Sequence, residues 1–468
     1  MYDEFKVDSG FEDNVKLRQN IAQSGISTDE ILAHMNISPE TYKNIIKQSL
    51  LQIKSKIIDD KLTGYEQIYR LLEVTTDFDR DFFDNAFEDI ISEDEDLSVI
   101  ASECLSKIID TSPSKINGLY NIEEILRILF SILNSPLTKQ KRNIFTKVIL
   151  SSNETRNLIN DDFSQILIDR IINSQEREDI ACLLDIYNKL YKLNRVLTNE
   201  LPNLLHFIEK FFVIGDSHLY LAILYLVNNT IMNCKDPNWL DSFSQTEFVE
   251  KIISSFSSDN PTAGRVIISI IYNLVGHEDG IRSEITMNQI SNSNIIEILT
   301  YLATPGNSSY FKMVFGISTA LLESSSAFHV KFFQSPIPSF IFENYDNFEY
   351  SIKKDAILLL KQVCISSRIS NEIFNFLIDN ELILKTIDYF EDENIIEPLL
   401  DLIFALVSAA LKNGAYLNNE KFIEQIVDDD LYDALLEINN DEDLNVNDDV
   451  RTKAYDLILI RNKILNSD

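Results

Sequence analysis

The chain has 468 residues and a formal net charge of −33, from 74 acidic and 41 basic side chains. A surface this acidic repels phosphate backbones and anionic lipids, so we expect neither nucleic acid nor a membrane as a partner, whereas a basic peptide fits the charge. Solubility alone is the other explanation for the acidic surface. Only 11 glycines and 10 prolines are present, which disfavours barrels, sandwiches and glycine-rich phosphate loops and favours an all-α fold.

We expect residues 1–64 to form an N-terminal segment that is partly mobile and contains short helices. Residues 14–22 have a helical pattern, and a capping-box pattern begins at Ser27. Ser38 followed by Pro39 predicts the start of a further helix.

Residues 65–468 show one pattern throughout. Apolar residues recur at helical spacing, and no alternating strand pattern of useful length appears. The predicted helical segments follow in this order: 66–74, 77–91, 97–108, 122–133, 144–150, 163–172, 180–190, 204–213, 219–231, 248–256, 265–275, 295–302 and 311–322.

The stretch 351–461 shows the repeat most clearly. Its successive apolar stripes are Ala356, Leu360 and Val363; Ile373, Phe376 and Leu377; Leu382, Leu384, Ile387 and Phe390; and Ile395, Leu399, Leu402 and Leu406. A three-helix unit that restarts after about 40–47 residues is typical of armadillo or HEAT repeats. Only neighbouring units can cover the apolar face of each unit, so we predict a right-handed superhelical solenoid of stacked repeats over 65–468, capped by a helix at 450–464.

The cysteines are far apart in the sequence and have no histidine at metal-ligand spacing: Cys104, Cys182, Cys234 and Cys364. We expect buried thiols in a reducing compartment. The N-terminus lacks the basic and apolar regions of a secretory signal, and the longest apolar runs are about half the ~20 residues that a membrane helix needs. We therefore expect a cytoplasmic or nuclear protein.

No catalytic or cofactor motif is present. The histidines are scattered (His34, His206, His218, His277 and His329), and no GxSxG, GxGxxG or GxxxxGK[ST] pattern occurs. With 74 carboxylates, chance pairings are unavoidable, so no acid–base pair can be assigned. We expect a non-catalytic protein without metal or cofactor. An enzyme with a deep pocket of converging titratable groups is the alternative.

Three short motifs follow one another near the C-terminus: KKDA at 353–356, FIEQ at 422–425 and KAYDLI at 453–458. In this order they resemble the end of importin-alpha, the armadillo adaptor of nuclear import. The resemblance implies an armadillo solenoid that binds an extended, basic nuclear-localisation segment of a cargo protein in its concave groove.

In that family, Trp side chains on the third helix of each repeat stack on cargo Lys and Arg, and Asn side chains four residues later bind the peptide backbone. At matching helix positions this chain has Asn188, Tyr225, Asn229, Ser269, Asn273, Leu358 and Gln362. The three Asn residues are 41 and 44 residues apart, whereas the Trp positions before them hold Leu184, Tyr225 and Ser269. Trp239 lies in a DPNW turn outside the pattern. Ordinary solvent-facing positions are the other interpretation of these Asn residues.

The resemblance also implies a carrier similar to importin-beta as a second partner. Lys16 and Arg18 lie where importin-alpha has its carrier-binding segment, but the dense basic runs of that segment are absent here. A frayed terminal helix is the alternative interpretation of these residues. For the whole chain, the alternative is an armadillo or HEAT scaffold of another pathway, such as a phosphatase regulatory subunit or a chaperone cofactor.

Overall fold

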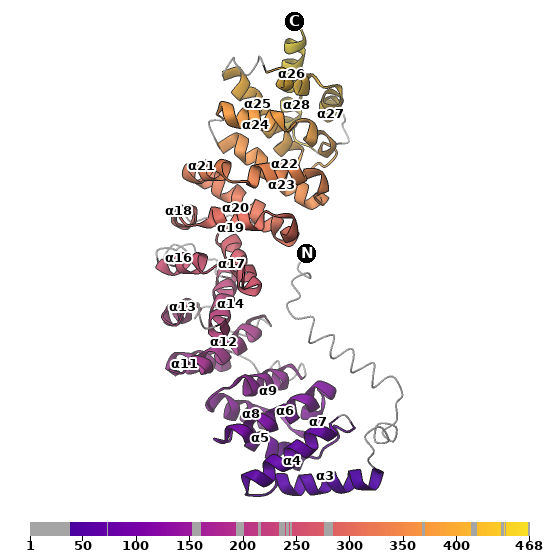
Figure 1. The fold of residues 1–468 in the computed structure, drawn as a ribbon. Helices are drawn as coiled ribbons and strands as arrows, with labels where there is room; N and C mark the ends of the chain where they lie inside the picture. The colour runs from indigo at the N-terminus through magenta and orange to yellow at the C-terminus, as the bar shows by residue number, and fades with distance from the viewer. Residues whose placement is uncertain are drawn as a thin grey trace. The chain divides into compact units, whose positions relative to one another are not determined.

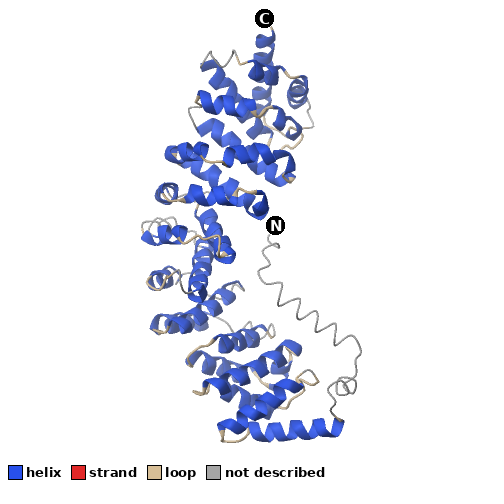
Figure 2. Ribbon diagram, viewed as in Figure 1, coloured by secondary structure: helices blue, strands red, loops and turns tan. Residues whose placement is uncertain are grey.

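The computed structural model describes residues 38–72, 74–151, 161–192, 201–213, 217–233, 239, 243, 246–275, 284–366, 370–412, 419–440, 444 and 446–466. Within these ranges every regular element is an α-helix or a 3-10 helix, and no strand occurs (Figure 2). The chain divides into two compact units, Met1–Asn229 and Thr230–Asp468, called here the N-terminal and C-terminal units. The predicted all-α fold of stacked helical repeats is confirmed.

The helices of the N-terminal unit are labelled in Figure 1. They are α3 (Pro39–Ile53), α4 (Ile58–Leu71), α5 (Arg80–Ile90), α6 (Glu95–Thr111), α7 (Lys115–Leu119), α8 (Ile122–Asn134), α9 (Lys139–Leu150), α11 (Asp161–Asn173), α12 (Arg177–Lys192), α13 (Leu201–Glu209) and α14 (Ser217–Asn233), whose last residues belong to the C-terminal unit. In this unit α4 packs against α6, α6 against α9, and α9 against α12.

The C-terminal unit, taken by itself, is also built of packed helices. Its elements are α16 (Glu247–Ser254), α17 (Pro261–Leu274), α18 (Glu284–Asn292), α19 (Ile295–Leu302), η1 (Pro305–Tyr310), α20 (Phe311–Ser324), α21 (Ser326–Gln334), α22 (Ile337–Asn344), η2 (Tyr345–Asn347), α23 (Tyr350–Ser366), α24 (Asn371–Asp379), η3 (Leu384–Tyr389), α25 (Ile396–Lys412), α26 (Glu420–Val427), α27 (Asp429–Asn440) and α28 (Asp448–Leu465). The long helices α25 and α28 each follow two shorter helical elements, α24 and η3 in the first case and α26 and α27 in the second.

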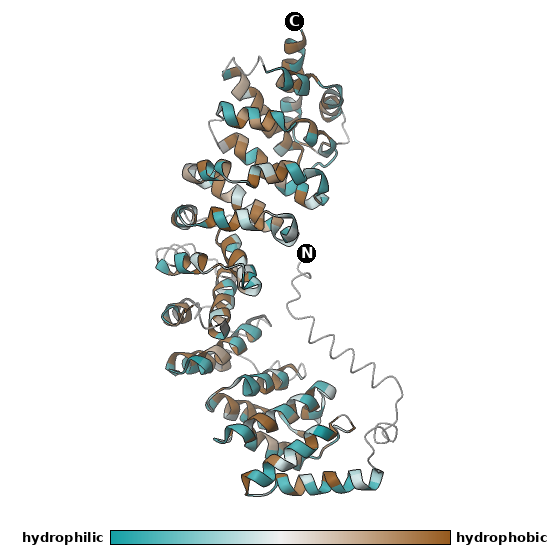
Figure 3. Cartoon of the chain, viewed as in Figure 1, coloured by the Kyte–Doolittle hydropathy of each residue, from teal (hydrophilic) through white to brown (hydrophobic). Residues whose placement is uncertain are grey.

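We call the helices that pack in series inside each unit the third helices. They are α4, α6, α9, α12 and α14 in the N-terminal unit and α17, α20, α23, α25 and α28 in the C-terminal unit. In the C-terminal unit α17 packs against α20, α20 against α23, α23 against α25, and α25 against α28. Apolar and polar residues are interspersed around the helices, which is expected when one side of a helix is buried and another is exposed (Figure 3). Neighbouring repeats therefore provide the core for one another, as the repeat pattern predicts.

Helix α20 illustrates how much of a third helix is buried. Its buried residues are Phe311, Met313, Val314, Phe315, Ile317, Ser318, Ala320, Leu321 and Leu322. Because they occupy most of the circumference, α20 can be covered only by α17 and α23 on its two sides together with shorter helices such as α18 and α21. Burying one such Phe or Leu side chain contributes about 1.5–3 kcal/mol.

Short polar side chains set several helix starts. Ser38 accepts a hydrogen bond from the amide of Thr41, and Pro39 occupies the first turn of α3, which confirms the start predicted there. Asn121 and Glu124 form a capping box at the start of α8. The capping box expected at Ser27 lies outside the described residues.

The first helix predicted for the repeat region starts earlier in the structure than expected. The helix predicted from residue 66 begins at Ile58, because the acidic side chains of Asp59 and Asp60 lie in its first turn, where the helix dipole favours them. Residues 38–64 thus hold α3 and the first half of α4. The proposed division of the chain at residue 65 stays a prediction.

The apolar stripes after residue 370 also differ from the prediction. Helix α24 buries Phe374, Leu377 and Ile378, while Ile373 and Phe376 are only half-buried. The expected third stripe forms the 3-10 helix η3 instead of an α-helix. The chain turns first at Glu381, whose φ is 57°, and such a left-handed residue ends a regular helix.

The buried cysteine thiols agree with the sequence prediction where they can be seen. Cys104, Cys182 and Cys364 are buried and free, and Cys234 lies outside the described residues. Burial raises the pKa of all three thiols and thereby keeps them protonated at neutral pH.

Gly64 allows close packing of α3 on α4, so we predict that Gly64→Ala destabilises the N-terminal unit. A Cβ atom there would lie 2.8 Å from the carbonyl oxygen of Ser49 and 2.9 Å from Cγ1 of Ile53. Overpacking of this kind costs about 1–3 kcal/mol. Gly118→Ala is the matched control, because nothing lies within 4 Å of its Cβ position and alanine favours the helix. Urea unfolding followed by circular dichroism should show opposite signs for the two variants, and equal effects would contradict the packing argument.

Because His329 is buried, we predict that the folded protein loses stability in mild acid. The residue is 8% exposed, its Nε2 has no hydrogen-bond partner, and burial lowers its pKa from the usual 6.5. Since the folded state favours the neutral ring, its contribution to stability is complete above pH 6.5 and is lost as the pH falls through the lower folded pKa.

We expect His329→Gln to flatten the decrease in the free energy of unfolding between pH 7.5 and pH 5, measured by urea unfolding. His206→Gln, on the exposed side of α13, is the control and should retain the wild-type pH dependence. If His329→Gln also kept the wild-type pH dependence, the buried ring of His329 would not be the source of that dependence.

Candidate functional site

Asn188 on α12 and Asn229 on α14, both predicted to face a groove, form a buried pair in the N-terminal unit. They are 6% and 7% exposed. Nδ2 of Asn229 donates to Oδ1 of Asn188 over 2.9 Å, and Nδ2 of Asn188 donates to the carbonyl of Ala222 over 2.9 Å. The hydroxyl of Tyr191 donates to the carbonyl of Asn229, also over 2.9 Å. The structure thus brings these two predicted residues together, and their amides join α12 to α14.

The other five predicted residues are half-buried. Tyr225 lies on α14 in the N-terminal unit, Ser269 and Asn273 lie on α17 in the C-terminal unit, and Leu358 and Gln362 lie on α23. Each of the two C-terminal pairs is spaced i, i+4 and therefore shares one side of its helix. Peptide binding by the seven residues stays a prediction.

Three positions, spaced i, i+3 and i+4, can be compared in six of the third helices. They hold Glu103, Ser106 and Lys107 in α6; Asn143, Thr146 and Lys147 in α9; Leu184, Tyr187 and Asn188 in α12; Tyr225, Asn228 and Asn229 in α14; Ser269, Tyr272 and Asn273 in α17; and Leu358, Lys361 and Gln362 in α23. In these six helices the third position is Lys in α6 and α9, Asn in α12, α14 and α17, and Gln in α23. Helices α14 and α17 carry no carboxylate at all, although the protein is strongly acidic.

Trp239 does not belong to this series. Its ring stacks on Phe243 in the C-terminal unit, with ring centroids 5.1 Å apart and an interplanar angle of 13°. The indole is half-buried in this contact. The sequence prediction that Trp239 lies outside the pattern of the third helices is consistent with this packing.

Charged side chains connect neighbouring third helices in the N-terminal unit. Nζ of Lys147 on α9 lies 2.6 Å from Asp110 on α6 and donates to Oγ of Ser106 over 2.5 Å. The guanidinium of Arg142 pairs with Asp185 on α12, and Nε2 of His218 on α14 lies 2.8 Å from the same carboxylate. These cations are therefore paired within the protein.

The third helices of the C-terminal unit are joined in the same way. Asp401 on α25 contacts Lys361 on α23 over 3.2 Å and Lys453 on α28 over 2.6 Å. Asp355 on α23 behaves differently, because burial raises its pKa to about 6 against the opposing effect of Lys312 and Lys354. A cation placed beside Asp355 would favour its ionised form.

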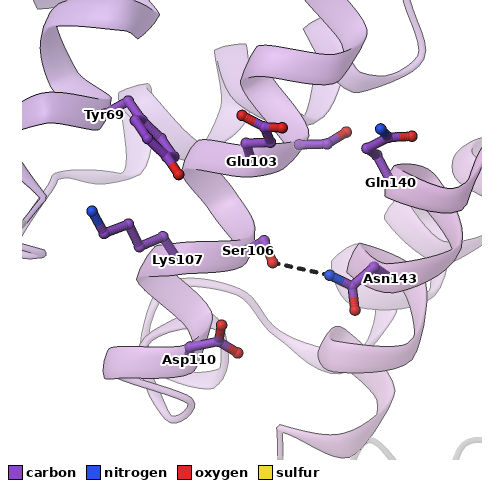
Figure 4. A pocket seen from close by; sticks show the side chains of 8 residues that line it. Tyr69, Glu103, Ser106, Lys107, Asp110, Gln140 and Asn143 are labelled. Atoms are coloured by element: carbon purple, nitrogen blue, oxygen red, sulfur yellow. Dashed lines mark hydrogen bonds between the residues drawn. The ribbon is translucent and has the colours of Figure 1, made fainter. Parts of the chain in front are cut away.

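A recess of about 300 Å³ lies on third helices α4, α6 and α9, as seen in Figure 4. It is lined by Tyr69, Ser102, Glu103, Ser106, Lys107, Asp110, Gln140 and Asn143. The sequence did not point to it, because polar residues at helical spacing are typical of a solvated helix face. The available signal was that Glu103 and Asn143 occupy the same position in successive repeats.

The described residues offer neither a metal site nor a membrane-spanning helix. They contain no group of three or more His, Cys, Asp or Glu side chains that could hold a metal ion. Over the same part of the chain, no helix combines the length and the apolar character needed to cross a membrane.

No protein-family model matches the chain, and no curated protein matches it in sequence. Solved structures match its fold. A structure from work on a phosphorylation switch that controls the interaction between cadherin and beta-catenin has a TM-score of 0.58 at 11% identity, over 90% of this chain and 82% of that chain. An engineered protein matches with a TM-score of 0.50 at 12% identity, over 90% of this chain and 99% of its own length.

A designed armadillo repeat protein covers 56% of this chain and 100% of its own length, at 13% identity and a TM-score of 0.42. At such identities the likeness concerns the fold. The chain is an all-α repeat protein of stacked third helices. More particularly, it has an armadillo-type fold, and the finer resemblance to importin-alpha stays a prediction.

We predict that Asn188 and Asn229 stabilise the N-terminal unit as a pair. Asn188→Ala would leave Nδ2 of Asn229 and the carbonyl of Ala222 without these partners inside the protein, at a cost of about 1–3 kcal/mol. The double variant Asn188→Ala/Asn229→Ala should lose less than the sum of the single losses, since both break the same bond. Urea unfolding of the four proteins checks this, and strict additivity would contradict the coupling.

Proposed function

We propose that the protein is a non-catalytic adaptor that binds an extended, basic segment of a partner protein along its third helices. The armadillo-type fold supports a role as a scaffold, since one of its structural neighbours comes from work on the interaction between cadherin and beta-catenin. Stacked repeats of this kind offer an extended surface without a deep catalytic cleft.

The observation that carries the proposal is the composition of the half-exposed side of each of two third helices, α14 with Tyr225 in the N-terminal unit and α17 in the C-terminal unit. Tyr225 and Asn228 lie on α14, and Ser269, Tyr272 and Asn273 lie on α17, all half-buried and all uncharged. An amide group both donates and accepts hydrogen bonds, as an extended peptide backbone requires. The face of a tyrosine ring attracts the cationic end of a Lys or Arg side chain.

The net charge of −33 supports a basic partner. Charge of one sign over a whole protein raises the local concentration of an oppositely charged ligand and speeds its association. The uncharged sides of α14 and α17 would then contact the backbone and the stems of the partner's side chains. Long-range attraction and short-range recognition thus come from different parts of the surface.

The finer proposal is nuclear protein import. The motifs at 353–356, 422–425 and 453–458 support it through their resemblance to importin-alpha, which would make a carrier similar to importin-beta the second partner and place the protein in the cytoplasm and nucleus. The second candidate function is a scaffold of another pathway. The buried Asn188–Asn229 pair favours it, because those amides already serve the packing of α12 on α14.

The test is a fluorescence anisotropy titration of a labelled Lys/Arg-rich nuclear-localisation peptide at low and at physiological salt, with a scrambled acidic peptide as control. We expect binding of the basic peptide alone, weaker at higher salt because ions screen the attraction. Tyr225→Ala should weaken binding about two- to fivefold, which corresponds to the ~0.5–1 kcal/mol of an exposed cation–π contact.

Asn273→Ala should also weaken binding, whereas its matched control Asn292→Ala, an exposed position on α18, should not. Equal binding of the basic and acidic peptides would contradict the proposal. The basic peptide could also bind in a salt-sensitive way but with the same affinity to Tyr225→Ala and Asn273→Ala. That result would support the adaptor function and show that these two residues are not its contacts.

A further inference from the structure

The recess between α4, α6 and α9 contains two kinds of polar group. Some are engaged inside the protein. Nδ2 of Asn143 donates to Oγ of Ser106 over 3.1 Å, as the dashed line in Figure 4 shows. Nζ of Lys107 lies 4.8 Å from the centroid of the Tyr69 ring, so that ring already faces a cation on this side. The carboxylate of Asp110 pairs with Lys147 over 2.6 Å.

Other groups in the recess are open. The carboxylate of Glu103 and the side-chain amide of Gln140 make no hydrogen bond and no ion pair with any described residue. Figure 4 shows them on neighbouring helices, Glu103 on α6 and Gln140 on α9, with Asn143 one turn further along α9. Glu103 and Gln140 thus offer three oxygen acceptors to a ligand, two from the carboxylate and one from the amide, and Oδ1 of Asn143 adds a fourth.

We propose that this recess binds the guanidinium group of an arginine in the partner polypeptide. The guanidinium carries five N–H donors in a fixed planar fork, which can pair with the Glu103 carboxylate through two parallel bonds and reach the amide oxygens beside it. An ammonium group is a point charge and would use fewer of these acceptors at once. A phosphate is disfavoured beside the Glu103 carboxylate, which has no cation paired with it and would repel the phosphate.

The proposal rests on the proposed function and adds a second contact region on the same series of helices. Glu103 and Asn143 hold in α6 and α9 the position that Tyr225 holds in α14. The recess would recognise arginine through a carboxylate and amides, whereas the aromatic position on α14 offers the face of a ring. An arginine in the partner is therefore selected by hydrogen-bond geometry as well as by charge.

The experiment compares two labelled peptides that differ at one residue, arginine or the uncharged isostere citrulline, at low salt. We expect Glu103→Gln to weaken binding of the arginine peptide about three- to tenfold and to leave the citrulline peptide nearly unchanged. Glu123→Gln is the matched control, because it removes the same charge at an exposed site on α8 in the same unit. Equal effects of the two Gln variants would overturn the site.

Lys107→Gln gives a test of opposite sign. Removing this cation should strengthen binding of the arginine peptide, because a like charge leaves the recess and the Tyr69 ring becomes accessible. Weaker binding after Lys107→Gln together with stronger binding after Glu103→Gln would mean that the recess does not hold the guanidinium, and would reject the proposal. Thermal melting of each variant checks that the fold is retained.

Saturation-transfer NMR with N-acetyl-arginine methylamide separates this proposal from the proposed function. A signal that Glu103→Gln abolishes and Glu123→Gln retains would support the arginine site, even if no nuclear-localisation peptide bound to α14 and α17. Peptide binding that depends on Tyr225 and Asn273, together with equal signals from wild type and Glu103→Gln, would support the adaptor and overturn the arginine site.

Discussion

The structure depends on burying each third helix on several sides at once. In α20 the buried residues include Phe315 and Leu321, neither of which has any exposed surface. No single repeat can cover such a helix, so the stability of one repeat is tied to contacts with the repeats before and after it. This also explains why the apolar pattern in the sequence continues without a break, because every repeat supplies part of the core of the next.

Buried polar side chains fix how the repeats fit together. Asp179 on α12 accepts hydrogen bonds from the amide of Leu137 and the hydroxyl of Ser174, over 2.8 and 2.6 Å, and pairs with Arg170. Gln425 on α26 accepts from one backbone group near η3 and donates to another at the end of α24. Apolar contacts tolerate small shifts between helices, but a buried polar group is costly when its partners are lost. These side chains therefore fix the register that apolar packing alone leaves loose.

The sequence predicts the fold better than the site, for a physical reason. Helical spacing of apolar residues, and caps such as Ser38 with Pro39, depend on local chemistry that one chain segment carries by itself. Whether Asn188 points to a partner or to Asn229 depends on the distance between two helices, which a single sequence does not reveal. The same holds for the recess, because its polar residues come from three helices and each helix alone has an ordinary solvated face.

The distribution of ion pairs separates the cations that hold the helices together from the carboxylates that have no partner inside the protein. Lys61 contacts the buried Asp89, Lys147 contacts Asp110, and Lys453 contacts Asp401, so these cations serve contacts between helices. With 74 acidic side chains and only 41 basic ones, many carboxylates have no internal partner. An unpaired carboxylate beside an amide, as at Glu103, differs from the general negative field because it fixes the direction in which a cation must approach. Under the proposed function, the charge excess would attract basic segments in general, and a carboxylate placed in a recess would decide where a particular side chain binds.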